Sequence, residues 1–289
     1  MKSKNEHLIG MFQILLGAAL FGLVPIFVRY GQEISTSSLV FFRAFFGMIF
    51  IYAILKLSKK TLSPFKEERI TLIVWSVISL LAIGSYFIAI KSIDIASAVL
   101  LLYSQSIFIV LFSKFWLKEK IKLITIVALV LSIIGVILII SPSGFKFSGN
   151  ALGYIFAIIA AFLAGLNFMF PKKYFKNYDA YSLTFYQNLW QLPALIIFVL
   201  FFPPKITLIN IGIFAGLGLF CTALAFLLIY MGSRKVLGQH IGILQTSEAI
   251  VPIVLGIIIF SEIPSLIVII GGLLLILGYI IIGLKESKS

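Results

Sequence analysis

The sequence predicts an all-α integral membrane protein of about ten transmembrane helices in two inverted five-helix repeats. Three observations lead to this fold class. First, 61% of the 289 residues are hydrophobic and only 11% are charged, whereas soluble domains carry roughly 25% charged residues. Second, apolar runs long enough to cross a bilayer recur along the whole chain. Third, the second half repeats the first when the sequence is shifted by 143 residues.

The expected spans follow from the length of the apolar runs, because a helix needs about 20 mainly apolar residues to cross the hydrocarbon core. The runs show none of the alternation that is typical of barrel strands, so they are expected to be helices. In order, the expected spans are about 8–28, 37–56, 70–90, 95–114, 122–141, 151–171, 180–202, 208–230, 239–260 and 264–284.

The internal repeat gives residues of the first half a partner in the second half. Each half holds five spans, and an odd number means that the second copy enters the membrane from the opposite side. We therefore expect two domains, residues 1–143 and 144–289, joined by a Ser- and Gly-rich segment at 141–150. Pairs related by the shift of 143 are Gly10–Gly153, Gly22–Gly165, Gln105–Glu248, Glu119–Glu262 and Gly135–Gly278.

The positive charges alternate between the two sets of loops, in a chain of net charge +13. One set, which includes both termini, carries 18 of the 23 Lys and Arg residues, and the other carries Arg29, Lys91, Lys146 and Lys205. The positive-inside rule therefore predicts a multi-pass protein of the plasma (inner) membrane with both termini in the cytoplasm. Because topology accounts for the basic residues, we expect no nucleic-acid partner.

The inverted duplication indicates a class of function. Inverted repeats are the architecture of alternating-access transporters, whose substrate site lies near the midplane between the copies. The expected partners are then a small-molecule substrate, the lipid bilayer and protons, with the chain a monomer or a homodimer. A non-transporting receptor or assembly subunit would explain the hydrophobicity but not the duplication. A membrane-embedded transferase would need converging acids or a nucleophile–base pair, which the sequence does not display.

Motifs for cofactors and metals are missing from the sequence. It contains no phosphate-loop pattern, and its two histidines and one cysteine form no cluster along the chain. We therefore expect no cofactor, no metal and no enzymatic activity.

The end of each half carries the most specific pattern. In the first half, Tyr103-Ser104-Gln105 precedes Glu119 by fourteen residues, and in the second half Glu248 precedes Glu262 by fourteen. This pattern resembles the EamA-type ten-span members of the drug/metabolite transporter superfamily, over essentially the whole chain. The resemblance implies efflux or exchange of a small metabolite, such as an amino acid or a related compound. One departure is that a proline common after the ninth-span glutamate is Ala249 here, with Pro252 three residues later.

Glu248, near the middle of the ninth span, is the foremost candidate for a functional residue. A charge at the bilayer centre costs roughly 2.5–3.5 kcal/mol, so such residues face an aqueous cavity or a partner. Burial favours the neutral carboxyl, which has the chemistry to exchange a proton in each cycle. The alternative is a carboxyl bonded to a neighbouring helix. Its repeat partner Gln105 is expected nearby at the midplane, with Tyr103 and Gln245 as companions.

Arg43, in the second span, matches an arginine common in the resembled family. It lies about six residues inside its span, or roughly 9 Å deep. There it has the chemistry to receive a substrate carboxylate or to pair with Glu248. The alternative is that its side chain snorkels to the external interface. Further polar candidates are Gln187 and Asn188 in the seventh span and Asn167 in the sixth.

Four glycines at repeat-related positions are predicted to serve helix packing or gating. Gly22 and Gly165 each follow an alanine by four residues, a small-xxx-small spacing that lets helices approach closely. Gly135 and Gly278 occupy the last span of each half. Glu119 and Glu262, at span ends, are expected to be interfacial caps or ion-pair partners of neighbouring lysines.

Overall fold

The computed structural model describes residues 4–63, 69–140, 150–201, 203–204, 207–251, 254 and 265–285, and these contain helices and no extended strand. The helices of the first half are α1 (Lys4–Phe21), α2 (Val24–Tyr30), α3 (Thr36–Leu57), α4 (Arg69–Ser92), α5 (Ile95–Leu102), α6 (Gln105–Phe115) and α7 (Leu123–Ile140). Those of the second half are α8 (Ala151–Tyr174), α9 (Ala180–Leu189), α10 (Leu192–Phe201), α11 (Leu208–Gly218), the π-helix η1 (Leu219–Leu224), α12 (Ala225–Ser233), α13 (Gly238–Gln245), the 3₁₀ turn η2 (Thr246–Ala249) and α15 (Leu266–Lys285).

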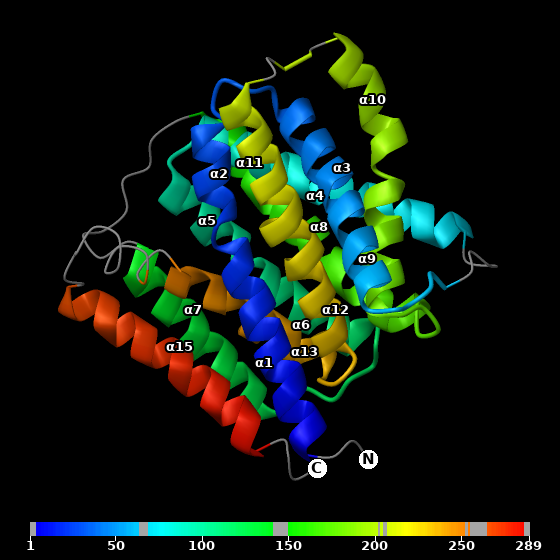
Figure 1. The fold of residues 1–289 in the computed structure, drawn as a ribbon. Coiled ribbons are helices and arrows are strands. Elements are labelled where there is room, and N and C mark those ends of the chain that lie inside the picture. Colours follow the sequence, from blue (N-terminus) through cyan, green and yellow to red (C-terminus); the bar gives the residue numbers. More distant parts are fainter. Residues whose placement is uncertain are drawn as a thin grey trace.

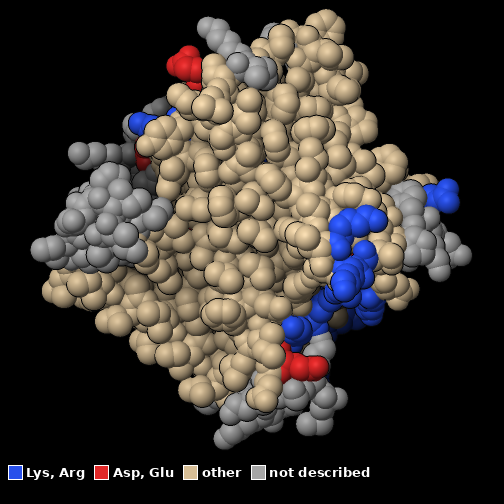
Figure 2. Space-filling view, viewed as in Figure 1, with Lys and Arg blue, Asp and Glu red and all other residues tan. Residues whose placement is uncertain are grey.

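The helices confirm the predicted all-α membrane fold. Seven helices in the described part are long and apolar enough to cross a membrane, and 123–139 forms a shorter apolar helix. The expected seventh span is divided into α9 and α10, and residues 252–253 and 255–260 of the expected ninth span lie outside the described residues. Figure 2 shows a broad uncharged face with Lys and Arg gathered mainly near one lower edge. Large hydrophobic side chains are exposed on many of the helices, which fits contact with lipid rather than water.

The two halves contact each other reciprocally. The first span packs on the eighth (α1 on α12), and the sixth packs on the third (α8 on α4). A Cβ built on Gly10 would lie 2.5 Å from the Cβ of Lys235, and one on Gly153 would lie 2.8 Å from the Cβ of Ser92. These two contacts are related by the shift of 143 residues. Such an exchange of partners is what a two-fold relation between two copies produces.

The last spans of the halves follow the same rule. A Cβ on Gly135 of α7 would lie 2.7 Å from the carbonyl oxygen of Gly271, and one on Gly278 of α15 would lie 3.2 Å from that of Ala128. Again the two contacts are 143 residues apart. The lack of side chains at these glycines lets α7 and α15 lie in close contact along one edge of the bundle (Figure 1).

Gly22 and Gly165 also form equivalent contacts, but their helices differ. A Cβ on Gly22 would lie 2.7 Å from the Cβ of Val251, and one on Gly165 would lie 2.9 Å from the Cβ of Phe108. The first span is interrupted at Gly22, whereas α8 runs unbroken through Gly165. Pro25 explains the interruption, because its ring lacks an N–H and clashes with the carbonyl four residues earlier.

The fourth and ninth spans are both interrupted near their middle. The fourth span breaks between α5 and α6 at Tyr103–Ser104, and the ninth changes from α13 to the 3₁₀ turn η2 at Thr246. A hydroxyl competes for a helix carbonyl at each break: Ser104 Oγ donates to Leu101 O at 2.7 Å, and Thr246 Oγ1 donates to Ile243 O at 2.7 Å. At membrane depth such backbone is tolerated only inside protein or beside a cavity.

Candidate functional site at the paired helix breaks

A cavity lies where the two breaks meet. It offers about 80 Å³ to the centres of water-sized molecules, and on the order of 10–15 Å³ by this measure accommodates one water. Several waters therefore fit. Polar side chains at its wall are Arg43, Tyr86, Gln105, Asn167, Cys221, Gln245 and Glu248, and aromatic rings are those of Phe21, Phe87, Phe168 and Phe226.

Five of the eight predicted polar candidates line this one cavity. They come from α3, α6, α8, α13 and η2, so both halves contribute: Arg43, Gln105, Asn167, Gln245 and Glu248. The other three do not line it. Tyr103 is buried at the break beside it, while Gln187 and Asn188 lie on the buried face of α9.

The Glu248 carboxyl is buried and faces the cavity. The residue is 6% exposed, and within the described part of the chain its carboxylate has neither a hydrogen bond nor an ion pair. The phenols of Tyr86 and Tyr103 lie within electrostatic range of it. Both hydroxyls, and the amide nitrogen of Gln245, are buried without a partner among the described residues. The carboxyl is thus available to a proton or a ligand, and the alternative of a bond to a neighbouring helix is not observed there.

Gln105 opens α6 directly after the first break and is 3% exposed. It faces the same cavity as Glu248, from the other half of the chain. The two positions match in depth but not in chemistry, because an amide cannot ionise.

Arg43 is buried rather than snorkelling. It is 2% exposed; its Nη1 donates to Thr222 Oγ1 at 2.8 Å and its Nη2 donates to Gln191 Oε1 at 3.1 Å. No ion pair with Glu248 is found within the described residues, so the expected pairing is not seen. The physical reason is that two neutral acceptors on neighbouring helices already satisfy the end of the guanidinium. Its Nε has no partner in the described part and remains available at the cavity wall.

Sequence reasoning missed the residues that hold Arg43. Thr222 belongs to the π-helix η1 and donates its own hydroxyl to Leu217 O at 2.9 Å, and such π-turns are frequent at functional sites. Gln191 follows the end of α9 and donates to Ser79 Oγ at 3.2 Å. The sequence does place several polar residues inside apolar spans, which indicates a polar site, but it does not predict which residue each of them contacts.

A second polar network fixes Asn167 and Gln187. Gln187 Nε2 donates to Asn167 Oδ1 at 2.7 Å, and Tyr230 OH donates to Gln187 Oε1 at 2.9 Å. The indole N–H of Trp75 donates to the backbone carbonyl oxygen of Asn167 at 2.9 Å. Asn188 instead donates to Thr184 O at 2.7 Å within its own helix. Gln187 and Asn188 therefore support the wall rather than face the cavity.

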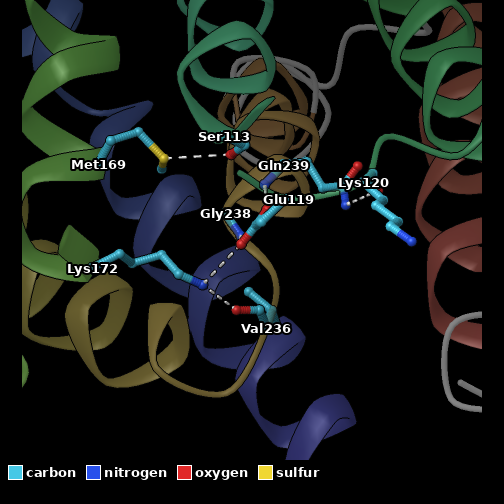
Figure 3. Close-up of polar contacts among 8 residues, drawn as sticks. All are labelled: Ser113, Glu119, Lys120, Met169, Lys172, Val236, Gly238 and Gln239. Atoms are coloured by element: carbon cyan, nitrogen blue, oxygen red, sulfur yellow. Dashed lines mark hydrogen bonds and ion pairs between the residues drawn. The ribbon is translucent and has the colours of Figure 1, made fainter. Parts of the chain in front are cut away.

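At one end of the bundle, which we call the lysine-rich end, a polar network joins the segment after α6 to the start of α13 and to α8 (Figure 3). It is the end that carries 56–60, 114–122, 172–176 and 234–235, where Lys60 lies over Tyr181, Lys173 donates to Trp116 O and Arg234 donates to Phe175 O. Here Glu119 Oε1 accepts from Gly238 N at 2.8 Å and Oε2 accepts from Gln239 N at 3.1 Å. Lys172 Nζ lies 3.9 Å from Glu119 Oε1 and donates to Val236 O. Glu119 is thus both a helix cap and an ion-pair partner, while Glu262 lies outside the described residues.

Comparison with known proteins identifies the family that the chain resembles. The model of the EamA-like transporter family matches the chain twice, over residues 8–141 and 151–284. An uncharacterized transporter of Archaeoglobus fulgidus is 30% identical over 94% of this chain and 95% of its own length.

More distant relatives include named transporters. The human solute carrier family 35 member G1 is 27% identical over 89% of this chain and 74% of its own length. The pseudopaline exporter CntI of Pseudomonas aeruginosa is 24% identical over 61% of each chain. A solved crystal structure superposes with a TM-score of 0.81 over 98% of this chain and 99% of its own, at 18% identity, which supports the fold.

Proposed function

The chain belongs to the EamA-like transporter family, and from this membership we propose that it is a secondary transporter of the plasma (inner) membrane. In this proposal it exports or exchanges a small metabolite by alternating access, as 1–143 and 144–289 rock against each other. The observation that carries the proposal is the buried carboxyl of Glu248, which has no partner among the described residues, in a cavity lined by both halves. Discontinuous helices at a repeat interface are where transporters of this architecture bind substrate.

The proposed substrate class is an amino acid or a related zwitterion. Glu248 offers a carboxylate to an ammonium group, and Arg43 Nε, which has no partner among the described residues, offers a donor to a carboxylate. Phenyl rings such as those of Phe21 and Phe168 complete the wall and suit an apolar or flat side chain.

The proposed coupling of substrate transport to protons follows because one carboxyl, that of Glu248, binds either a proton or the ammonium group of the substrate. A protonated Glu248 has lost the charge that attracts an ammonium group, so proton binding and substrate binding compete there. If the carrier changes its facing direction only with substrate bound or with Glu248 protonated, it exchanges substrate for protons. Transport by this route depends on pH on both sides of the membrane.

A binding screen followed by transport tests the proposal. Purified protein is heated with a panel of amino acids, because a ligand of the folded state raises its apparent stability. Glu248→Gln and Arg43→Ala are expected to abolish the stabilisation, while Glu6→Gln, the same chemical change at an exposed residue, is expected to retain it. Proteoliposomes then measure uptake under a pH gradient. If uptake and its pH dependence survive Glu248→Gln, the proton coupling is wrong.

A further inference from the structure

The first turn of α13 is capped by a residue of the other half. The first N–H groups of any helix lack partners within the helix and need other acceptors. The residue at the N-cap, Leu237, has no side chain that can accept. Both oxygens of Glu119, from the segment after α6, supply the missing acceptors to Gly238 and Gln239.

The repeat-related helix α5 does not depend on the other half in this way. Its N-cap residue Asp94 accepts from Ser97 N at 2.8 Å, which is a local cap. Asp94 and Leu237 are 143 residues apart. The same position is therefore self-sufficient in the first repeat and satisfied across the repeat interface in the second.

The start of α13 also packs directly on α6. A Cβ on Gly238 would lie 2.6 Å from Ser113 Oγ and 2.9 Å from Leu117 Cδ1. One turn later, Ser106 Oγ donates to Gly242 O at 2.7 Å. Because α13 presents no side chain at Gly238 and Gly242, it lies in close contact with α6 along this line.

Lys172 ties a third element to the same carboxylate. It extends from the last turn of α8 to Glu119 and to Val236 O, as Figure 3 shows. The Lys172 and Glu119 side chains are both largely shielded from solvent. Hydrogen bonds to an ionised group in such surroundings are stronger than those between neutral groups.

We propose that Glu119 is the residue that holds the lysine-rich end shut, and that its release from the start of α13 opens the cavity to this end. The proposal rests on alternating access, the function proposed above. Because α13 leads directly into η2, separation of α13 from Glu119 also moves the segment that carries Glu248. Glu119 is thus a positioning residue that links closure of this end to the site.

Accessibility of a single cysteine tests the proposal without a known substrate. The one native cysteine is replaced by Cys221→Ser, and Ala164→Cys places a thiol at the cavity wall. Labelling with a membrane-impermeant maleimide is measured in vesicles of both orientations. Lys114→Cys, at an exposed position, identifies the preparation that presents the lysine-rich end. Glu119→Ala is expected to raise labelling from this end by roughly tenfold, since two bonds to a charged acceptor are lost.

A second substitution distinguishes a role of Glu119 in closing the lysine-rich end from a role only in capping α13. Leu237→Asp in the Glu119→Ala background supplies a local cap of the kind that Asp94 gives α5. It is expected to restore thermal stability while labelling from the lysine-rich end stays high. Asp94→Ala is the matched control and is expected to lower stability without raising that labelling.

Two results would overturn the proposal. Unchanged labelling in Glu119→Ala would show that the end is held by other contacts, and full return of the double variant to wild-type labelling would show that Glu119 only caps a helix. Should Glu119→Ala not fold, Glu119→Gln keeps the shape and removes the charge. Either negative result with intact transport leaves alternating access standing. A cavity thiol that is never labelled from the lysine-rich end, with substrate candidates present or absent, would count against alternating access itself.

Discussion

The break in the fourth span and the break in the ninth occupy equivalent places, yet they carry different chemistry. Both have a hydroxyl bonded back to a helix carbonyl, and both face one cavity. The first presents the amide of Gln105 and the second the carboxyl of Glu248. The duplication thus sets where polar groups lie, while only one of the two can change its charge. A scaffold with two-fold contacts can therefore hold a site that lacks this symmetry.

The largest expected effect comes from making the two breaks alike. Glu248→Gln leaves an amide at both, and we expect net transport driven by a pH gradient to be lost. The fold is expected to persist, because the Glu248 carboxyl has no partner to lose among the described residues and burial of an unpaired polar group does not stabilise a fold. Proteoliposome flux and thermal unfolding measure the two quantities, with Gln105→Asn as the control that keeps the charge difference. Wild-type flux in Glu248→Gln would show that transport does not depend on the chemical difference between the two breaks.

Exchanging the two residues sharpens the comparison. In the double variant Gln105→Glu with Glu248→Gln, the carboxyl faces the same cavity from the other half. We expect flux between those of Glu248→Gln and the wild type, since the donors near position 248, such as Tyr86 and Gln245, keep their places. Full activity would mean that transport requires a carboxyl in the cavity, whichever break carries it. No activity would mean that the second break alone supports transport.

Arg43 and Gln187, which a shift of 144 residues relates, provide a second pair for comparison. Arg43→Ala leaves Thr222 and Gln191 without their donor and is expected to cost about 1–3 kcal/mol of stability. It should also weaken binding of substrates that carry a carboxylate. Gln187→Ala breaks the contacts to Asn167 and Tyr230 and should reduce stability alone. Equal losses of substrate affinity in Arg43→Ala and Gln187→Ala would contradict the assignment of a binding role to Arg43 and a structural role to Gln187.

The smallest expected effects concern the breaks themselves. Ser104→Ala removes one hydroxyl bond and is expected to change stability by about 0.5–1 kcal/mol. Thr246→Val should cost more, because Thr246 Oγ1 also lies 3.1 Å from Tyr279 OH, which would lose a buried partner. Thermal unfolding of the two variants measures the difference. A larger loss in Ser104→Ala would show that the first break is the more constrained one.

The fold could be predicted from the sequence because membrane helices are local features of composition. Span length and the spacing of repeat-related glycines need no knowledge of contacts. The contacts of Arg43 could not be predicted, since Thr222 and Gln191 lie 179 and 148 residues away. The division of the seventh span near Trp190 was not predicted, although Pro193 in the first turn of α10 is a local signal for such a break. That Gln105 and Glu248 share a cavity was accessible only because the repeat relates them.

The reciprocal glycine contacts describe an interface that a half-length chain would form with a second copy of itself, inserted the other way up. In such a dimer one glycine would fill the roles of both Gly135 and Gly278, and any substitution would appear twice. Fusion into one chain fixes the ratio of the two orientations at one to one. It also lets each half acquire its own substitutions. An ancestor of that kind would have carried two acids or none at its midplane, whereas the fused chain carries one.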